Sequence, residues 1–371
     1  MTSKGEKVIR IHRVHLEEDT GKLTHVEQDG KTFSLVDLNR AGVSLLEIVT
    51  EPDFHSAEEV RAYAEALRAL VRYLGVNSGD LEKGVMRIEP NISVRPLGRL
   101  ELGTKVEIKN LNSFKALERG VAYEINRQIE LIEAGQSVIQ ETVGWDENKQ
   151  ATYSQRSKED AHDYRYFPEP DLPPLLVSKQ WMEAVRQALP ELPLQRSRRF
   201  VAEYGLSSAE AWQLAAEKAA GEYFEAVIKA GGGAVRTVYA WVTGELFALM
   251  NAAGSSFDTL KVRPQDLADL LKMIADGQIN QNTGKSVLAG MFASGSSAAS
   301  IVAEKGLAQV SDTGFIAQMV SEALTENAGE VASYRAGKLS VANFLFGQIM
   351  RKAGGKANPQ VVRTELERQL K

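Results

Sequence analysis

The sequence has no cysteine among its 371 residues. This absence excludes disulfide bonds, a thiolate nucleophile and zinc sites built on cysteine. It leaves no sign of an oxidising compartment, so a cytoplasmic protein is expected. Long apolar runs are also missing, since none approaches the roughly 20 residues of a membrane-spanning helix. The first residues, MTSKGEKVIR, lack the apolar segment of a signal peptide. No association with a membrane is expected.

Several catalytic motifs are absent as well. The sequence contains no GxxxxGK[ST] phosphate-binding loop and no GxGxxG segment after a strand, and its five histidines show no HExxH spacing. No serine lies in a recognisable nucleophile motif. The chemistry of this chain must therefore come from carboxylates and basic side chains.

Basic residues are concentrated near the C-terminal end. From Arg335 onward there are eight lysines and arginines against two acids, which gives a net charge of +6. Because the whole chain carries −5, the preceding 334 residues carry −11. This asymmetry suggests an anionic partner for the tail, although a solvated helix surface explains the charge about equally well.

The hydrophobic pattern predicts an α+β protein. Residues 8–53 and 85–109 are typical of short strands with turns. Between and after them, a capping box at Ser56 predicts a helix that ends at Gly75, and a second helix is predicted from about 112 to 135.

The rest of the chain is predicted to be helical. Four of the eleven prolines fall within 167–176, which favours an extended belt that closes the first domain. After about Ser178 the pattern is almost wholly helical, and Pro264 suits the first turn of a further helical module. The predicted domains are residues 1–178, 179–262 and 263–371.

Two of the predicted strands carry a charged face. In VMRIEPNISVR and TKVEIKN, the alternation of polar and apolar residues places the polar side chains of each strand on one side. They are Arg87, Glu89, Asn91, Ser93, Arg95, Lys105, Glu107 and Lys109. On periodicity alone, an antiparallel sheet with one solvated side explains this pattern best. Pro90 predicts an edge strand or a bulge.

Acidic residues suggest a second explanation for these faces. Glu47 interrupts the apolar run LLEIV and must point either to solvent or into a site, because an unpaired buried carboxylate is very costly. Acids that could join it in one sheet are Glu17, Glu18, Asp19 and Glu89. Converging carboxylates without cysteine favour Mg²⁺, which commonly serves phosphate groups that arginine and lysine also hold. Each acid alone is more often a surface residue.

Five motifs resemble those of the B-subunit (GatB) family of the bacterial aspartyl/glutamyl-tRNA amidotransferases, in the same order along essentially the whole chain. They are HLEEDTGK, DLNRAGVSLLEIVTEPD, TKVEIKNLNSFKALERG, DYRYFPEPDLPPL and the terminal YRAGK…FLFGQIMRKAGGKANPQVV. The resemblance implies an antiparallel-sheet cradle domain, a helical domain and a tail domain similar to the YqeY proteins. The family begins with a further segment bearing metal-site residues and part of the cradle sheet, and this sequence starts after it, so the cradle is expected to be incomplete.

The resemblance also implies a chemistry. The family uses ATP and Mg²⁺ to phosphorylate the side-chain carboxylate of a glutamate or aspartate mischarged on tRNA, and ammonia then displaces the phosphate to give the amide. Glu18 and Glu47 match acidic positions at the family's metal site. Glu89 stands at an aspartate position, where the family usually reads RCDAN and this chain reads RIEPN. These three acids are the expected catalytic residues and metal ligands.

The expected contacts with ATP and tRNA come from basic residues. Arg87, Lys105 and Lys109 are expected to hold ATP on the strands that neighbour the acids. In the tail, the residues expected to contact tRNA are Lys338, Arg351, Lys352 and Lys356, because such a cluster suits a phosphate backbone.

The assembly that the resemblance implies is a heterotrimer with a glutaminase (GatA) and a third, small subunit (GatC). A non-catalytic tRNA-binding module is the competing hypothesis, since the family's first segment does not precede this sequence. A helical tail on an unrelated metal-binding sheet is less consistent with the order of the motifs. The sequence leaves open whether Asn-tRNA or Gln-tRNA is the product and whether this chain alone is active.

Overall fold

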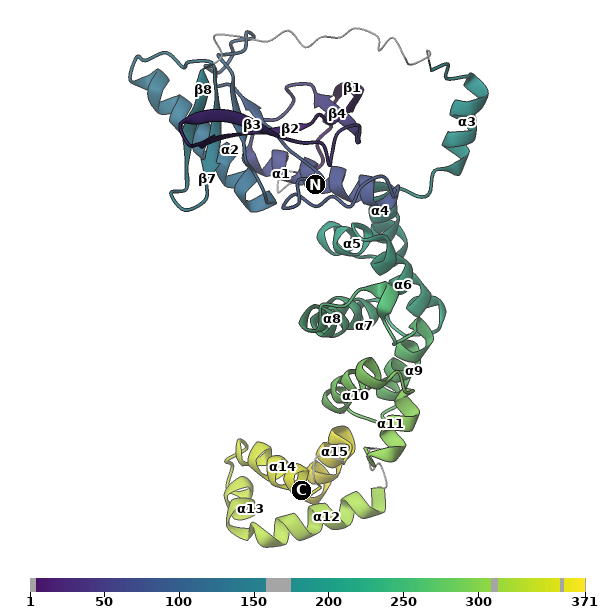
Figure 1. Ribbon diagram of the computed structural model, residues 1–371. Helices are drawn as coiled ribbons and strands as arrows, with labels where there is room; N and C mark the ends of the chain where they lie inside the picture. The colour runs from purple at the N-terminus through teal and green to yellow at the C-terminus, as the bar shows by residue number, and fades with distance from the viewer. Residues whose placement is uncertain (1–4, 158–174, 308–312, 354–356, 371) are drawn as a thin grey trace. The chain divides into compact units, whose positions relative to one another are not determined.

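The computed structural model describes residues 5–157, 175–307, 313–353 and 357–370 (Figure 1). The chain divides into two compact units, Met1–Pro193 and Leu194–Lys371, which are described separately. The fold is α+β, with strands in the first unit and helices throughout the second. The finer predicted division at 178 and 262 stays a prediction. Most of the predicted extended belt, residues 167–174, lies outside the described residues.

The strands of the first unit form two ribbons and one larger sheet. Strand β1 pairs with β4, β2 pairs with β3, and the larger sheet has the order β5-β6-β7-β8. The strands are β1 (Ile11–Glu18), β2 (Lys22–Gln28), β3 (Lys31–Asp37), β4 (Ser44–Thr50), β5 (Asn91–Ile92), β6 (Val106–Lys109), β7 (Glu141–Asp146) and β8 (Ala151–Ser157). Pro90 directly precedes β5, which is an edge strand as predicted.

A two-residue turn joins β2 to β3. Asp29 and Gly30 both have positive φ angles, of 54° and 69°. An Asp-Gly pair favours this geometry, which matches the twist of the flanking strands and fixes their register. The turn at 28–31 is therefore confirmed.

Helices α1 (Ala57–Tyr73) and α2 (Phe114–Glu133) lie where the sequence predicts them. Ser56 accepts a hydrogen bond from the Glu59 amide at 3.3 Å, and Gly75 follows the helix with a φ of 66°. The predicted capping box is only half formed. The Glu59 carboxylate accepts from the His55 amide at 2.6 Å, one residue before the expected partner, and also binds Lys7.

The larger sheet is not wholly antiparallel, which corrects the expectation of an antiparallel cradle. Strands β6 and β7 pair in parallel, whereas β5–β6 and β7–β8 are antiparallel. The cause is α2, which lies between β6 and β7 in the chain and carries it back to the starting edge, as parallel neighbours require. The inner face of the sheet packs on α1 and α2 through Val106, Ile108 and Leu117, all almost fully buried.

The described residues of the second unit are helical, and one further helix, α3 (Lys179–Ala188), precedes them in the first unit. The predicted continuous helix over 209–228 is divided into α5 and α6, and a π-helical turn, η1, lies between α7 and α8. The elements are α4 (Pro193–Tyr204), α5 (Ser208–Ala215), α6 (Lys218–Lys229), α7 (Val235–Ala240), η1 (Trp241–Leu246), α8 (Phe247–Ala253), η2 (Phe257–Thr259), α9 (Pro264–Ala275), α10 (Gln281–Ser294), α11 (Ala298–Glu304), α12 (Thr313–Glu326), α13 (Ala328–Arg335), α14 (Val341–Lys352) and α15 (Pro359–Leu370). Pro264 begins α9 as predicted.

Within the described residues, no single helix has the length and apolar composition to cross a membrane, although the bent pair α10 and α11 meets the test jointly by length and composition alone.

Candidate active site

The predicted alternation on β5 and β6 is confirmed by burial. Val106 and Ile108 are fully buried, whereas Lys105 is exposed and Glu107 and Lys109 are half-buried. Before β5, Met86 and Ile88 are half-buried while Arg87 and Glu89 are exposed, although only Asn91 and Ile92 form regular strand there. Arg87, Glu89, Lys105 and Lys109 therefore share the outer face of this part of the sheet. We call this set the polar strip.

Lys109 lies between two carboxylates in the polar strip. Its Nζ atom is 3.5 Å from Glu89 Oε2 and 3.9 Å from Glu107 Oε2. Glu107 is fixed in turn by Thr142 of β7, whose hydroxyl donates to it at 3.0 Å. Glu107 was not among the predicted site residues. Its place on the charged side of TKVEIKN was the signal that could have identified it.

Arg87 faces an acid from the first ribbon. Its guanidinium lies 3.9 Å from the carboxylate of Asp19, which directly follows β1. Arg40, in the loop between β3 and β4, approaches the same oxygen at 2.8 Å. The structure thus brings the end of β1, the loop before β4 and the segment before β5 together.

The register of the first ribbon separates the two predicted metal ligands of β1 and β4. Glu47 lies opposite His15, and Glu18 lies opposite Ser44. Because opposite residues share a face and neighbours along a strand alternate, Glu18 and Glu47 occupy opposite faces of the ribbon. Glu17 is the acid of β1 on the same face as Glu47. The structure therefore does not bring Glu18 and Glu47 together.

Glu47 answers the choice between solvent and site only in part. Its carboxylate is about one third exposed and lies 3.1 Å from the Arg13 guanidinium, so it is neither buried unpaired nor fully solvated. Among the described residues, no three histidine, aspartate or glutamate side chains cluster closely enough to hold a metal ion. The predicted three-carboxylate Mg²⁺ site is therefore not assembled by the described part of the chain.

A second ion pair fixes the end of the first ribbon. Arg10 contacts both carboxylate oxygens of Asp53, at 3.1 and 2.7 Å, and its amide donates to Asp53 at 2.9 Å. These hydrogen bonds lower the pKa of Asp53 to about 2. They attach the EPD end of the motif to the residues before β1.

A buried polar network holds the edge strand β5 in place. Glu124 and Gln128 of α2 are completely buried, and Gln128 donates to the carbonyl oxygen of Ile92 at 3.1 Å. Glu124 accepts from Gln128 at 2.8 Å and from Arg127 at 2.9 and 2.8 Å. These hydrogen bonds, opposed by burial, raise the pKa of Arg127. Because buried charges persist only when paired, this network ties α2 to the strand that follows Glu89.

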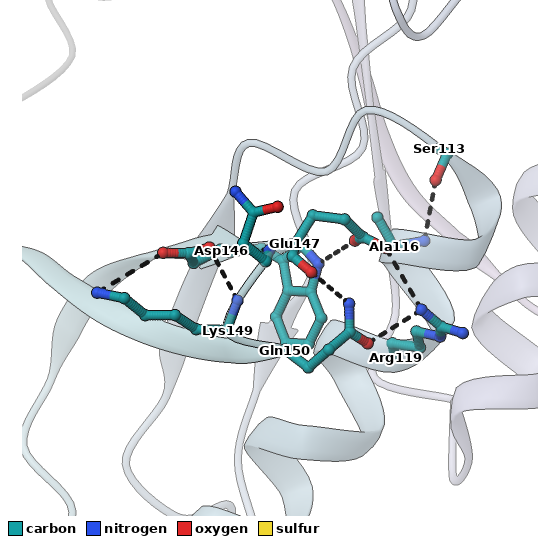
Figure 2. Close-up of polar contacts among 9 residues, drawn as sticks. Ser113, Ala116, Arg119, Asp146, Glu147, Lys149 and Gln150 are labelled. Atoms are coloured by element: carbon teal, nitrogen blue, oxygen red, sulfur yellow. Dashed lines mark hydrogen bonds and ion pairs between the residues drawn. The ribbon is translucent and has the colours of Figure 1, made fainter.

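Figure 2 shows how the first turns of α2 are tied to the turn between β7 and β8. Glu147 accepts from the Trp145 indole at 2.6 Å and lies 3.3 Å from the Arg119 guanidinium. Arg119 also donates to Gln150 at 3.0 Å. The pKa of Glu147 is lowered, chiefly by the bond from Trp145. Ser113 caps the helix by accepting from the Ala116 amide at 3.0 Å.

The predicted tRNA-contacting residues of the tail have different surroundings. Lys352 is held by two acids of α12, at 3.2 Å from Glu322 and 2.7 Å from Glu326, which raises the pKa of Lys352. Arg351 and Lys352 line a cleft of about 300 Å³ beside Glu326. Lys338 is exposed in the segment before α14. Lys356 lies outside the described residues.

The comparisons with known proteins define the class first. Residues 1–183 match the family described as the GatB/GatE catalytic domain, and residues 222–370 match the GatB domain. The polar strip and both ribbons fall within the catalytic match. The chain therefore belongs to this amidotransferase family.

Similar proteins give the particular member. The B subunit of the aspartyl/glutamyl-tRNA(Asn/Gln) amidotransferase of Myxococcus xanthus is 49% identical over 370 residues, which cover 100% of this chain and 76% of the relative. The protein of the same name from Herpetosiphon aurantiacus is 47% identical and covers 98% of this chain and 75% of the relative. The chain is thus a member of the B-subunit family, and the resemblance seen in its motifs is confirmed.

Proposed function

We propose that this chain is the component of a tRNA-dependent amidotransferase that activates the side chain of glutamate or aspartate on a mischarged tRNA. ATP phosphorylates that carboxylate, and ammonia displaces the phosphate to give Gln-tRNA(Gln) or Asn-tRNA(Asn). The observation that carries the proposal is the 49% identity with a named B subunit along the whole of this chain. Both matched domains support it, because they include the polar strip and the basic tail.

Within this function, we assign the phosphates of ATP to the basic residues of the polar strip. Arg87, Lys105 and Lys109 share one face, and their charges suit phosphate oxygens and the charge that develops during transfer. Glu89 lies 3.5 Å from Lys109 and would hold that ammonium in place. Mg²⁺ remains a predicted cofactor. No step is assigned to it, because the described residues do not gather its predicted ligands.

The proposed partners follow from the name that the relatives carry. As a B subunit, this chain would work with a glutaminase that supplies ammonia and with a third, small subunit, in the cytoplasm. It has no cysteine and no recognisable serine nucleophile of its own. Glutamine hydrolysis by the purified chain without the glutaminase partner would contradict this division of labour.

The test is amide synthesis by the assembled enzyme. The chain would be combined with the partner subunits and incubated with ATP, glutamine and either Glu-tRNA(Gln) or Asp-tRNA(Asn), and the amino acid released from the tRNA would be identified. We expect amide only when ATP is present, and the productive tRNA identifies the physiological product. Binding of tRNA without any amide would instead favour a non-catalytic tRNA-binding module.

A further inference from the structure

Asp19 is contacted by two arginines from distant parts of the chain. Arg40 Nη2 lies 2.8 Å, and Arg87 Nη2 3.9 Å, from the same carboxylate oxygen, Oδ2. The Asp19 side chain is only 16% exposed, whereas the side chains of Arg40 and Arg87 are 48% and 56% exposed. The carboxylate is therefore covered while much of both guanidinium groups stays accessible.

The charges at this point do not balance. Among the described residues, Asp19 is the acid with which both arginines pair, so two positive charges share one negative charge. Two cations this close repel each other, and one carboxylate offsets only part of that repulsion. A second anion on the accessible side would relieve it. The planar fork of arginine suits phosphate, which it can bind through two parallel hydrogen bonds.

The loop that carries Arg40 is held in one shape before any ligand binds. The Asp19 amide donates to the Val43 carbonyl at 2.8 Å, and the Gly42 amide donates to the Asp19 carbonyl at 2.9 Å. Gly42 has a φ of 78°, which favours glycine there. Asp37 accepts from the amide and the side chain of Asn39 at 2.9 and 2.6 Å. A loop fixed by these bonds loses little further entropy when a ligand arrives.

We propose that Arg40 and Arg87 form a phosphate-binding pair and that Asp19 is the positioning residue that holds them side by side. The pair deepens the proposed function and rests on it, because Arg87 belongs to the polar strip, where ATP is assigned. Two sources could supply the phosphate, namely the nucleotide or the backbone of the tRNA. Arg40 and Asp19 were not among the predicted ligand-binding residues, because only the folded loop brings them to Arg87.

The test measures binding separately from catalysis, on the assembled enzyme. ATP and deacylated tRNA serve as two separate probes for the variants Arg40→Gln and Arg87→Gln. We expect each variant to lose affinity for the same one probe by about tenfold or more, as for a lost charge-assisted hydrogen bond. Loss for ATP would identify the nucleotide phosphate, and loss for tRNA the RNA backbone. Unchanged affinity for both probes in both variants would overturn the proposal.

A matched control removes the same type of charge elsewhere in the unit. Arg61 of α1 is 44% exposed and lies 2.8 Å from both Glu65 and Glu118. Arg61→Gln should leave both affinities unchanged, and an equal loss in this variant would show a general charge effect and overturn the specific assignment. If the glutamine variants do not fold, Arg40→Lys and Arg87→Lys replace them. These keep the charge without the fork and should show a smaller loss for the same probe.

Asp19→Asn tests the positioning role. It should weaken the same probe as the arginine variants, because both guanidinium groups keep their charge but lose their common anchor. A lower melting temperature with unchanged affinity would show that Asp19 only secures the loop, and would overturn its positioning role. Amide synthesis by the unaltered assembly is measured in parallel. Its absence would refute the proposed function, whereas the binding results would still decide whether the arginine pair holds a phosphate.

Discussion

Glu225 shows how one carboxylate can secure two helices of the second unit. It lies on α6 and accepts hydrogen bonds from Arg196 at 2.6 Å and from Arg199 at 2.7 Å, both on α4. Burial alone would raise the pKa of Glu225, but the bonds from Arg199 and Arg196 outweigh it and lower the pKa to about 2. Arg196 is almost completely buried, so the pair cannot be replaced by solvent.

We predict that Glu225→Gln destabilises the second unit by roughly 3 kcal/mol at pH 7, because it leaves the buried Arg196 without its counter-charge. The folded pKa is depressed, so the stabilisation is fully present above the unfolded pKa, near 4.5, and is lost as the pH falls toward 2. The difference in the free energy of unfolding between wild type and variant should hold from pH 7 to 5 and shrink below about 4. Urea unfolding at these pH values measures it.

The control for this prediction is Glu203→Gln. Glu203 lies 3.1 Å from Arg199 but is about half exposed, so its loss should cost less than about 1 kcal/mol. Equal losses in both variants, or a difference for Glu225→Gln that stays constant down to pH 3, would contradict the assignment.

The second prediction at this scale concerns the acids of the first ribbon. Glu47→Gln keeps the size of the side chain and removes its charge, and we expect it to abolish acyl-phosphate formation in the assembled enzyme while glutamine hydrolysis by the partner continues. Glu17 shares the face of Glu47, and Glu18 lies on the other. If the ribbon keeps this register in the assembly, Glu17→Gln should also reduce activation, and Glu18→Gln should matter less.

Measured rates of ATP-dependent activation would separate the two possibilities. A loss in Glu18→Gln but not in Glu17→Gln would support the position implied by the family motif over the face defined by the strand register. Normal amide synthesis by Glu47→Gln would remove Glu47 from the site.

Secondary-structure elements were predictable wherever the signal is local. The 3.6-residue period and the capping serines located α1 and α2, and the two-residue alternation identified the outer face that carries Arg87 and Lys109. Strand pairing is not local. The parallel pairing of β6 with β7 depends on where α2 returns the chain, and the register of β1 with β4 decides which acids share a face. For this reason the sequence identified candidate acids without showing which of them lie together.

At the scale of elements, Gln128 links α2 to the two-residue edge strand β5. We predict that Gln128→Ala destabilises the first unit by about 1–3 kcal/mol, because the buried Ile92 carbonyl and the buried Glu124 each lose a donor. The segment before β5 should also exchange its amide hydrogens faster. Exchange measured by mass spectrometry on peptides covering 86–95 would show this change.

The matched control is Gln187→Ala on α3. Gln187 donates to Glu183 at 3.2 Å on an exposed helix surface, so the change should have little effect on stability. If Gln128→Ala leaves the exchange of 86–95 unchanged, the network does not hold the edge strand.

At the scale of the whole molecule, the charge asymmetry is partly balanced within the tail. Lys352 is paired with Glu322 and Glu326 of α12, and Arg368 pairs with Glu365 at 2.6 Å. Arg363 lies over the ring of Phe346, at 5.0 Å from its centre. The net charge of +6 therefore overstates the number of cations that are ready to meet an anion.

The last prediction uses this difference within the tail. Neutralising a phosphate releases counterions, so each lysine or arginine that contacts the tRNA backbone should contribute about one unit to the dependence of log affinity on log salt concentration. We expect Lys338→Ala and Arg351→Ala each to lower that slope by about one for the assembled enzyme, with similar losses for any tRNA sequence. Lys352→Ala should lower it less, because its two acids must first release the ammonium. Arg368→Ala, at a paired arginine of α15, is the control and should leave the slope unchanged. Titrations of tRNA at several salt concentrations measure these slopes, and equal slopes in all four variants would show that the basic tail is solvated surface that does not meet the tRNA.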